Sequence, residues 1–311
     1  MTRITVAAVQ ARPVALDAQA CLAKAARLVA EAGDQGAEFV VFPETFVPGY
    51  CQWAHSAPFE HPDHKAAYAR LVNNSLLLPD ELGPIQEAAR AAEVTVALGV
   101  TERVEATPGT LYNTLAIVGP GGGYIGKHRK LVPTHHERTV YEHGPGETLR
   151  AFETTIRAGR KVRFGGLLCW NNYMPLARYA LYQQGIQLYL APTADDLESW
   201  QTAMRFIARE SRCYVIAPAL LQHKEDFPED WELADEAAWQ AEPAWNERGG
   251  SCIVSPDGEY VAKPVYESEA ILTAEIDLDR VIAERQTFDP AGHYGRRDVL
   301  SLEVEGMDPL R

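Results

Sequence analysis

The sequence is poor in cysteine and in basic side chains, and it has no long apolar run. Its five cysteines are odd in number, widely spaced and never arranged as C-x-x-C, which argues against a disulfide framework or a zinc site and favours a reducing cytoplasm. No window reaches the ~18 consecutive apolar residues of a membrane-spanning helix. The apolar part of the N-terminal MTRITVAAVQARP is too short for a signal peptide, and Gln10 interrupts it. A cytoplasmic protein without membrane contact is therefore expected.

The shortage of positive charge restricts the possible partners. Across 311 residues, 29 Lys and Arg stand against 43 Asp and Glu, which gives a net charge of −14. Nucleic acid is not an expected partner, because phosphate binding relies on basic patches. With 46% hydrophobic residues, the chain has enough apolar material for a large core. The sequence contains no internal repeat and no linker, so we expect one domain spanning residues 1–311.

Short apolar runs alternate with segments of helical periodicity, which predicts an α/β protein. The predicted strands are 4–10, 37–44, 94–100, two within 111–128, 161–169, 186–193, 214–220 and a hairpin in 249–264. The predicted helices are 15–32, 80–92 with Asp80 as its N-cap, 175–185 and 200–213. The hairpins indicate a mixed sheet. Residues 222–248 are acidic, contain three Trp and have no clear period, which indicates a long excursion between two strands, of the kind that often covers sites.

Three reactive side chains stand at or just after predicted strand ends, where sites in α/β sheets collect. Glu44 ends one strand, Lys130 follows another, and Cys169 ends a third. A thiolate is a strong nucleophile, a carboxylate can take the thiol proton, and an ammonium can stabilise the charges that develop. A helix starting just after Cys169 would contribute free N–H groups. Each residue alone also has an ordinary explanation, as a core thiol, a helix-terminal acid or a solvated charge.

Two other patterns do not support a cofactor or a metal. GGGYIGKH (121–128) is nearly a P-loop, but His128 stands where the magnesium-binding hydroxyl is needed, so a hairpin turn is preferred. The spacing of His128, His135, His136 and His143 matches no zinc pattern. We therefore expect no cofactor and no metal.

Three longer blocks of the sequence resemble the signatures of the nitrilase branch of the carbon–nitrogen hydrolase superfamily. They are FPETFVPGY, GKHRKLVPTHHERTVYEHGPG and CWNNYMPLARYALYQQG, and further blocks such as APTADDLESW and FDPAGHYGRRDV extend the resemblance over nearly the whole chain. The resemblance implies a four-layer α-β-β-α sandwich with two mixed β-sheets. It also implies a catalytic triad of Glu44, Lys130 and Cys169, with Glu137 as a second glutamate that orients the lysine.

The same resemblance implies hydrolysis of an organic nitrile to the carboxylic acid and ammonia, through a cysteine thioimidate and thioester. The Trp that follows Cys169, Trp170, resembles the pattern of nitrilases, whereas amidase-type members of the superfamily more often have Tyr at this position. Trp170, Tyr50 and Thr193 are the expected substrate-binding residues, and Trp53 and Tyr173 could also line an apolar pocket or simply pack. An amidase, an N-carbamoyl hydrolase, a cyanide-hydrolysing enzyme and a non-catalytic binding module remain alternatives.

Family resemblance also predicts self-association, as a homodimer or higher even oligomer through residues 172–185. Because the sequence ends soon after GHYGRRDV, a discrete oligomer is expected rather than a long filament. One position departs from the family pattern, since nitrilases commonly read Cys-Trp-Glu where this chain reads Cys-Trp-Asn at Asn171. Either this substitution removes a negative charge near the thiol, which eases thiolate formation, or Asn171 points toward a subunit contact.

Overall fold

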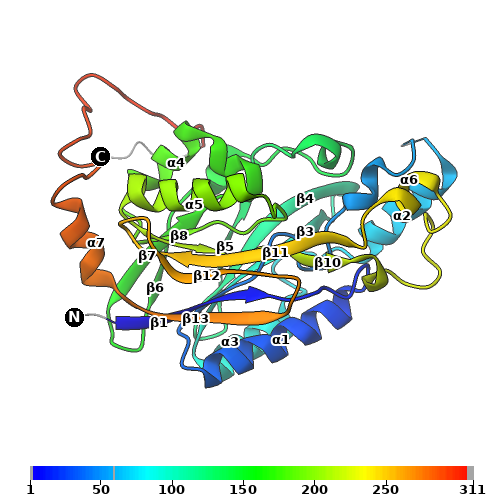
Figure 1. Cartoon of the computed structure of the whole chain (residues 1–311), viewed down its shortest axis with the longest axis horizontal. Coiled ribbons are helices and arrows are strands. Elements are labelled where there is room, and N and C mark those ends of the chain that lie inside the picture. Colours follow the sequence, from blue (N-terminus) through cyan, green and yellow to red (C-terminus); the bar gives the residue numbers. More distant parts are fainter. Residues whose placement is uncertain (1–2, 59, 307–311) are drawn as a thin grey trace.

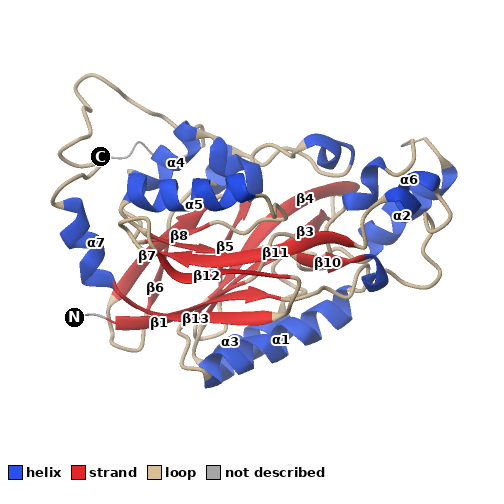
Figure 2. Cartoon of the chain, viewed as in Figure 1, coloured by secondary structure: helices blue, strands red, loops and turns tan. Residues whose placement is uncertain are grey.

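Two β-sheets pack face to face, and helices cover the outer face of each (Figure 1). This arrangement comes from a computed structural model in which residues 3–58 and 60–306 are described. Figure 2 shows the resulting layers of helix, sheet, sheet and helix. The expected four-layer sandwich is therefore confirmed.

The first sheet has the order β13-β1-β2-β3-β4-β5 and is mixed. β1 is parallel to β2 and β2 to β3, whereas the β13–β1, β3–β4 and β4–β5 pairs are antiparallel. Its strands are β1 (Arg3–Gln10), β2 (Phe39–Val41), β3 (Thr95–Val104), β4 (Thr107–Val118), β5 (Tyr124–Arg129) and β13 (Ala270–Asp277).

The second sheet has the order β10-β11-β9-β8-β7-β6, with β12 paired to β11. Its central strands β7, β8 and β9 are parallel, and the outer pairs are antiparallel. Its strands are β6 (Phe152–Thr155), β7 (Lys161–Gly166), β8 (Leu188–Leu190), β9 (Tyr214–Ala217), β10 (Leu221–His223), β11 (Trp245–Val254) and β12 (Tyr260–Tyr266).

Alternating side chains of the central strands fill different cores, which explains why these strands read as continuous apolar runs. In β1, Val6 and Ala8 belong to the core between the sheets, whereas Ala7 and Val9 belong to the core beneath the helices of the first sheet. Because successive strand residues point to opposite faces, both faces must be apolar when both are covered. Phe39 of β2 meets Phe164 of β7 across the sandwich, with ring centroids 4.7 Å apart.

Helices α1 (Ala18–Asp34) and α3 (Gly83–Ala92) cover the first sheet, and α4 (Pro175–Tyr182) and α5 (Glu198–Ser211) cover the second. The Asp17 side chain caps α1 by accepting the Ala20 N–H at 2.9 Å. The predicted Asp80 cap of α3 is wrong. The helix begins at Gly83 and follows Leu82, because the proline in its first turn has the fixed φ that suits a helix start.

Several helices and strands were not predicted from the sequence. They are β6, β13, α2 (Pro62–Asn73) and α7 (Leu278–Arg285). Residues 222–248 are also more ordered than predicted, because β10 opens this stretch, α6 (Ala237–Ala241) lies within it and β11 begins at Trp245. In Figure 1, α6 and α2 lie together at one end of the molecule, beyond the sheets.

The part of residues 222–248 outside the strands is anchored by aromatic packing. Phe227, Trp231 and Trp239 contact one another with ring centroids 4.8 to 5.9 Å apart, and Trp231 also meets Trp53 of the preceding half of the chain at 5.7 Å. We call these four residues the aromatic cluster.

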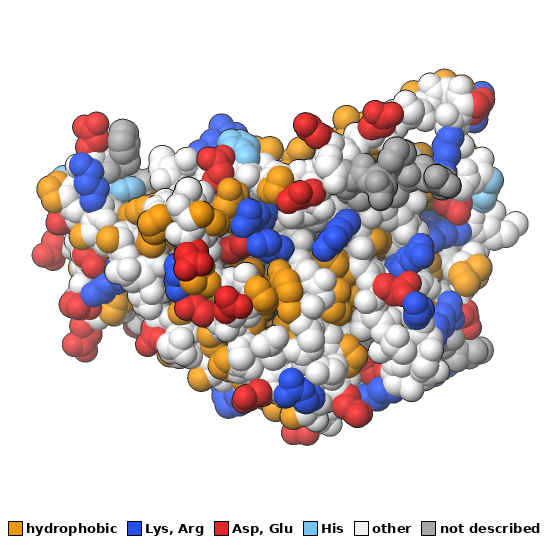
Figure 3. Space-filling view, turned by 180° about the vertical axis from the view of Figure 1, so that it is seen from behind, with side chains coloured by type: hydrophobic (Ala, Val, Ile, Leu, Met, Phe, Trp, Pro, Cys, Tyr) orange, Lys and Arg blue, Asp and Glu red, His pale blue; other side chains and the backbone are white. Residues whose placement is uncertain are grey.

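The molecular surface is mixed in charge. The face in Figure 3 carries acidic and basic side chains interspersed, with apolar side chains between them. No helix in the described ranges is both long and apolar enough to span a bilayer.

Candidate active site

Three strand ends bring the predicted triad together. Glu44 follows β2, Lys130 follows β5 directly, and Cys169 comes shortly after β7. Glu137 joins them from η2, a short 3-10 helix (His135–Thr139). We call these four residues the catalytic floor, and all four are buried.

Lys130 is the centre of this floor. Its ammonium donates to Glu44 Oε1 at 2.7 Å and to both oxygens of Glu137, at 2.8 and 2.7 Å. Burial alone disfavours an ammonium, but the charges of Glu137 and Glu44 outweigh burial and raise the pKa of Lys130. Lys130 is therefore positively charged in the resting protein.

Each of the four carboxylate oxygens of Glu44 and Glu137 accepts a hydrogen bond from a group other than Lys130. The Asn113 amide donates to Glu44 Oε1 at 2.7 Å, and the Ala194 N–H donates to Glu44 Oε2 at 3.0 Å. The Tyr50 hydroxyl donates to Glu137 Oε1 at 2.7 Å, and the Thr134 N–H donates to Oε2 at 3.0 Å. A network in which every carboxylate oxygen is satisfied holds the carboxylates in one arrangement.

The resting thiol is held in its neutral form. Burial is the largest cause that raises the pKa of Cys169 well above the ordinary value of 9.0, and the Glu44 charge raises it further, against the opposing effect of Lys130. Burial likewise raises the pKa of Glu44 above 4.5, although Lys130 opposes it. A raised carboxyl pKa makes Glu44 a stronger base, so this pair is suited to pass the thiol proton during attack.

Cys169 occupies a constrained turn. Its φ is +47°, in the left-handed region, and the 3-10 helix η4 (Cys169–Tyr173) begins at this residue. Such a conformation costs ~1–3 kcal/mol and persists only where neighbouring contacts hold it. Here the Asn172 side-chain amide donates to the backbone carbonyls of Leu167 and Cys169, both at 2.8 Å, and the Tyr189 hydroxyl donates to the Asn172 side-chain oxygen Oδ1 at 2.8 Å. The expected helix start after the thiol is thus a single 3-10 turn.

Asn171 lies inside the chain rather than on an outer surface, with 2% of its area exposed. Its side chain accepts the Val132 N–H at 3.1 Å and donates to the Val132 carbonyl at 2.8 Å. This two-point contact joins the turn of the nucleophile to the segment that carries Lys130. A carboxylate at position 171 could not make the second bond, because it has no N–H.

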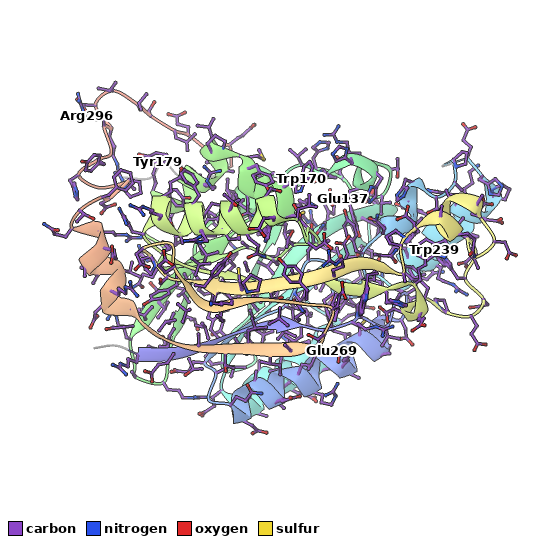
Figure 4. The ribbon with its side chains drawn as sticks, in the orientation of Figure 1. Glu137, Trp170, Tyr179, Trp239, Glu269 and Arg296 are labelled. Carbon is purple, nitrogen blue, oxygen red and sulfur yellow. The ribbon has the colours of Figure 1, made fainter. Side chains whose placement is uncertain are left out.

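A pocket of about 340 Å³ opens onto the thiol. Its lining consists of Tyr50, Gln52, Thr134, His135, His136, Cys169, Trp170, Ala194, Asp195, Asp196, Leu197, Asn246 and Glu247. In Figure 4, Trp170 and Glu137 lie toward the same end of the sandwich, and Trp239 lies farther out toward α6. The volume is at the lower end of the ~300–1,000 Å³ typical of ligand pockets, which suits a small substrate.

Some of the predicted substrate-binding residues line the pocket, and others lie outside it. Tyr50 and Trp170 line the pocket, and the Trp170 indole N–H donates to Asp195 at 2.8 Å. Thr193 is fully buried, it lowers the pKa of the Cys169 thiol, and it is not part of the pocket lining. Trp53 packs in the aromatic cluster, and Tyr173 packs against Trp170 at its exposed side.

Among the described residues, His128, His135, His136 and His143 are not part of the group that could hold a metal ion. Within the described residues, the group that could hold an ion is His61, Asp63 and Glu236, which lies outside the pocket. His128 is buried and bonds the Thr148 carbonyl at 3.1 Å. The P-loop-like segment 121–128 forms the end of the turn between β4 and β5 and most of β5 itself.

Comparisons with known proteins agree with this geometry. The family model described as carbon-nitrogen hydrolase matches residues 5–286. The chain is 40% identical over 311 residues to an aliphatic nitrilase from Sinorhizobium fredii (strain HH103), covering 98% of this chain and 96% of that one. It is 38% identical over 303 residues to a bifunctional nitrilase/nitrile hydratase from Lupinus angustifolius, covering 96% and 84%. A carbon-nitrogen hydrolase structure from Helicobacter pylori G27 shares the fold, with a TM-score of 0.73 at 19% identity over 96% and 97% of the chains.

Proposed function

Because this chain belongs to the nitrilase branch of the carbon–nitrogen hydrolase family, we propose that it hydrolyses an organic nitrile to the carboxylic acid and ammonia. The observation that carries the proposal is the buried set of one thiol, one ammonium and two carboxylates at the base of a small pocket. A thiol needs a base and a charge stabiliser to attack an uncharged carbon, and both are present.

Cys169 is the nucleophile in this proposal, and Glu44 is the general base. As Sγ attacks the nitrile carbon, the thiol proton passes to Glu44 and then to the nitrile nitrogen, which gives a thioimidate. Lys130 and the Trp170 backbone N–H, which has no acceptor among the described residues, stabilise the charge that develops on that nitrogen. Glu137 holds Lys130 in position through both of its oxygens.

The remaining steps use the same groups. A water molecule, deprotonated by Glu44, adds to the thioimidate carbon, and Glu44 returns this proton to the nitrogen, which gives a tetrahedral intermediate with one hydroxyl and one amino group. The hydroxyl proton then passes through Glu44 to the amino group, so that ammonia leaves as the carbonyl of the thioester forms. The resulting thioester is hydrolysed by a second water, which releases the carboxylic acid and restores the thiol. Each of these proton transfers passes through Glu44, in line with its raised pKa.

The decisive experiment compares a nitrile with the matching amide and follows ammonia release and product mass. Wild-type enzyme should convert the nitrile to the acid, and Cys169→Ala should abolish turnover while leaving the circular dichroism spectrum unchanged. A trapped adduct should map to the peptide that contains Cys169. Faster turnover of the amide would favour an amidase instead, and an adduct on the buried Cys51 would contradict the assigned nucleophile.

We also propose a cytoplasmic protein that associates as a dimer or higher even oligomer. All five thiols are free and buried, which suits a reducing compartment. Tyr173, Leu176 and Phe206 expose 41%, 67% and 57% of their areas on neighbouring elements η4, α4 and α5, which suits a self-association surface. Light scattering at micromolar concentration should give a discrete oligomer. Leu176→Glu should weaken it, whereas the equally exposed Ile282→Glu on α7 should not, and a wild-type monomer or long filaments would contradict the proposal.

A further inference from the structure

One carboxylate in the pocket has no hydrogen-bond or ion-pair partner among the residues that the structure describes. Glu247, near the start of β11, exposes only 7% of its area and lines the same pocket as Cys169. Within the described residues, its side chain makes no hydrogen bond and no ion pair. Because buried carboxylates are normally paired or hydrogen-bonded, a side chain in this state is suited to a group that arrives with the substrate.

A second acceptor beside Glu247 is also unsatisfied. The Asn246 side-chain oxygen is buried without a donor, and Asn246 lines the same pocket. Two neighbouring acceptors without donors indicate a ligand that brings N–H or O–H groups, because an alkyl group would leave both buried and unpaired. We call Asn246, Glu247, Asp195 and Asp196 the pocket wall.

The charge of the pocket indicates the sign of that ligand group. Its lining contains three acidic residues, Asp195, Asp196 and Glu247, and no lysine or arginine. Lys130 lies beneath the pocket and is already bound to two carboxylates. The guanidinium of Arg248, which follows Glu247, is directed to Glu267 at 2.9 Å.

His136, which lines the pocket from η2, does not supply a compensating charge. Burial, together with the proximity of His55, lowers the pKa of His136 to about 4, so its imidazole is neutral at neutral pH. Burial is the first cause that raises the pKa of Glu247 well above 4.5, and the Asp196 and Glu44 charges add to it. A cation placed beside Glu247 would relieve this unfavourable environment.

We propose that Glu247, together with Asn246 and Asp196, binds a primary ammonium group of the substrate, so that the preferred substrate is a short-chain nitrile that carries an amine. This inference rests on the proposed nitrilase function and specifies its substrate class. The ammonium would donate to the Glu247 carboxylate and the Asn246 oxygen while the nitrile carbon meets Cys169. A substrate that carries a carboxylate would face the acidic wall and be rejected by like-charge repulsion.

Three nitriles of similar size test this inference on wild-type enzyme. They are 4-aminobutyronitrile, valeronitrile, in which a methyl group replaces the ammonium, and 3-cyanopropanoate, which carries a negative charge. We expect kcat/KM for the amine to exceed that for valeronitrile about tenfold or more, because valeronitrile leaves polar groups of the site unpaired. The anion should be the poorest of the three.

A matched pair of variants assigns the preference to Glu247. Glu247→Gln removes the charge and keeps the shape, so the ratio of kcat/KM for the amine to that for valeronitrile should fall about tenfold, mainly through a higher KM for the amine. Glu198→Gln makes the same change at an exposed residue of α5 outside the pocket lining and should keep the wild-type ratio.

The outcomes separate the two proposals. If none of the nitriles is hydrolysed, the proposed function fails. If valeronitrile is hydrolysed at least as efficiently as the amine, the ammonium site is refuted while the nitrilase function stands. If Glu247→Gln does not fold, the wild-type preference alone decides the substrate class, and Asp196→Asn provides the second test of the wall. A folded Glu247→Gln enzyme with an unchanged ratio would overturn the assignment of Glu247.

Discussion

The catalytic floor is buried and the pocket wall is partly buried, both carry carboxylates, and they differ in how their polar groups are satisfied. In the floor, each oxygen of Glu44 and Glu137 accepts at least one hydrogen bond from the protein. In the wall, Glu247 and the Asn246 oxygen accept none from the described residues. A saturated network is already arranged for one reaction, whereas an unsaturated one is completed by what binds.

The two regions also differ in the parts of the fold that hold them in place. The floor is held at strand ends of both sheets, whose side chains interlock in the central core. Part of the wall continues from residues 224–244, which are attached through the aromatic cluster and through exposed ion pairs such as Arg70 with Asp230 at 2.8 Å. Exposed pairs contribute only ~0–1 kcal/mol each. Changes in the floor should therefore affect the chemical step, and changes behind the wall should affect substrate binding.

The largest effect is expected in the floor. Glu44→Gln keeps the size of the side chain but removes the base, so kcat should fall by ~10²–10⁴-fold. Lys130→Met should cause a comparable loss, since it removes the only ammonium of the floor and leaves Glu44 and Glu137 without their shared cation. Steady-state ammonia release measures both.

Glu102→Gln is the matched control for Glu44→Gln. Glu102 is equally buried and is paired with Arg129 at 2.6 Å, but it lies outside the pocket lining. Its loss should lower the melting temperature and leave kcat of the folded enzyme within about threefold, as expected for a site that does not touch substrate. A near-normal rate for Glu44→Gln would remove the assigned base and, with it, the distinction between floor and wall.

A smaller effect is expected where the floor is joined to the nucleophile turn. Glu44 must be ionised to act, and its pKa lies above 4.5, so kcat/KM should decline as the pH falls through that raised pKa.

Asn171→Glu adds a negative charge near Cys169 and loses the bond to the Val132 carbonyl. A nearby negative charge raises carboxyl pKa values further, so the acidic limb of the pH–rate profile should move upward, and the ratio of acid to amide product should change.

Asn171→Gln separates charge from shape, because Gln has the size of Glu and no charge. If the limb moves in Asn171→Glu but not in Asn171→Gln, the charge is responsible. The same profile and product ratio in all three proteins would mean that position 171 acts on the turn alone.

The smallest catalytic effect is expected behind the wall. Trp239→Leu removes one ring of the aromatic cluster, which lies outside the pocket lining. The loosened support should raise KM a few-fold while kcat changes little, and Trp239→Phe, which keeps an aromatic ring, should stay closer to wild type. Both constants come from one titration with nitrile. A collapse of kcat in Trp239→Leu would show that the two regions are not energetically separate.

The sequence alone was sufficient for the elements that carry a local pattern and for the residues that carry a family signature. The buried strands were predicted correctly because both of their faces are covered, which leaves an uninterrupted apolar run in the sequence. Glu44, Lys130, Glu137 and Cys169 lie in long motifs, and the fold brings all four together. The edge elements β6 and β13 were missed, because their half-exposed faces dilute that pattern.

Only the tertiary structure decided which side chains meet across distant loops. Asn113 reaches Glu44 over 69 positions of sequence, and the two-point bond of Asn171 to Val132 spans 39. Trp53 was a candidate for the pocket and packs instead against Trp231, far along the chain. Local periodicity reports the direction and burial of a side chain, whereas these contacts depend on strand register and on how the two sheets are stacked. For the same reason, the unpaired state of Glu247 becomes visible only when its surroundings are in place.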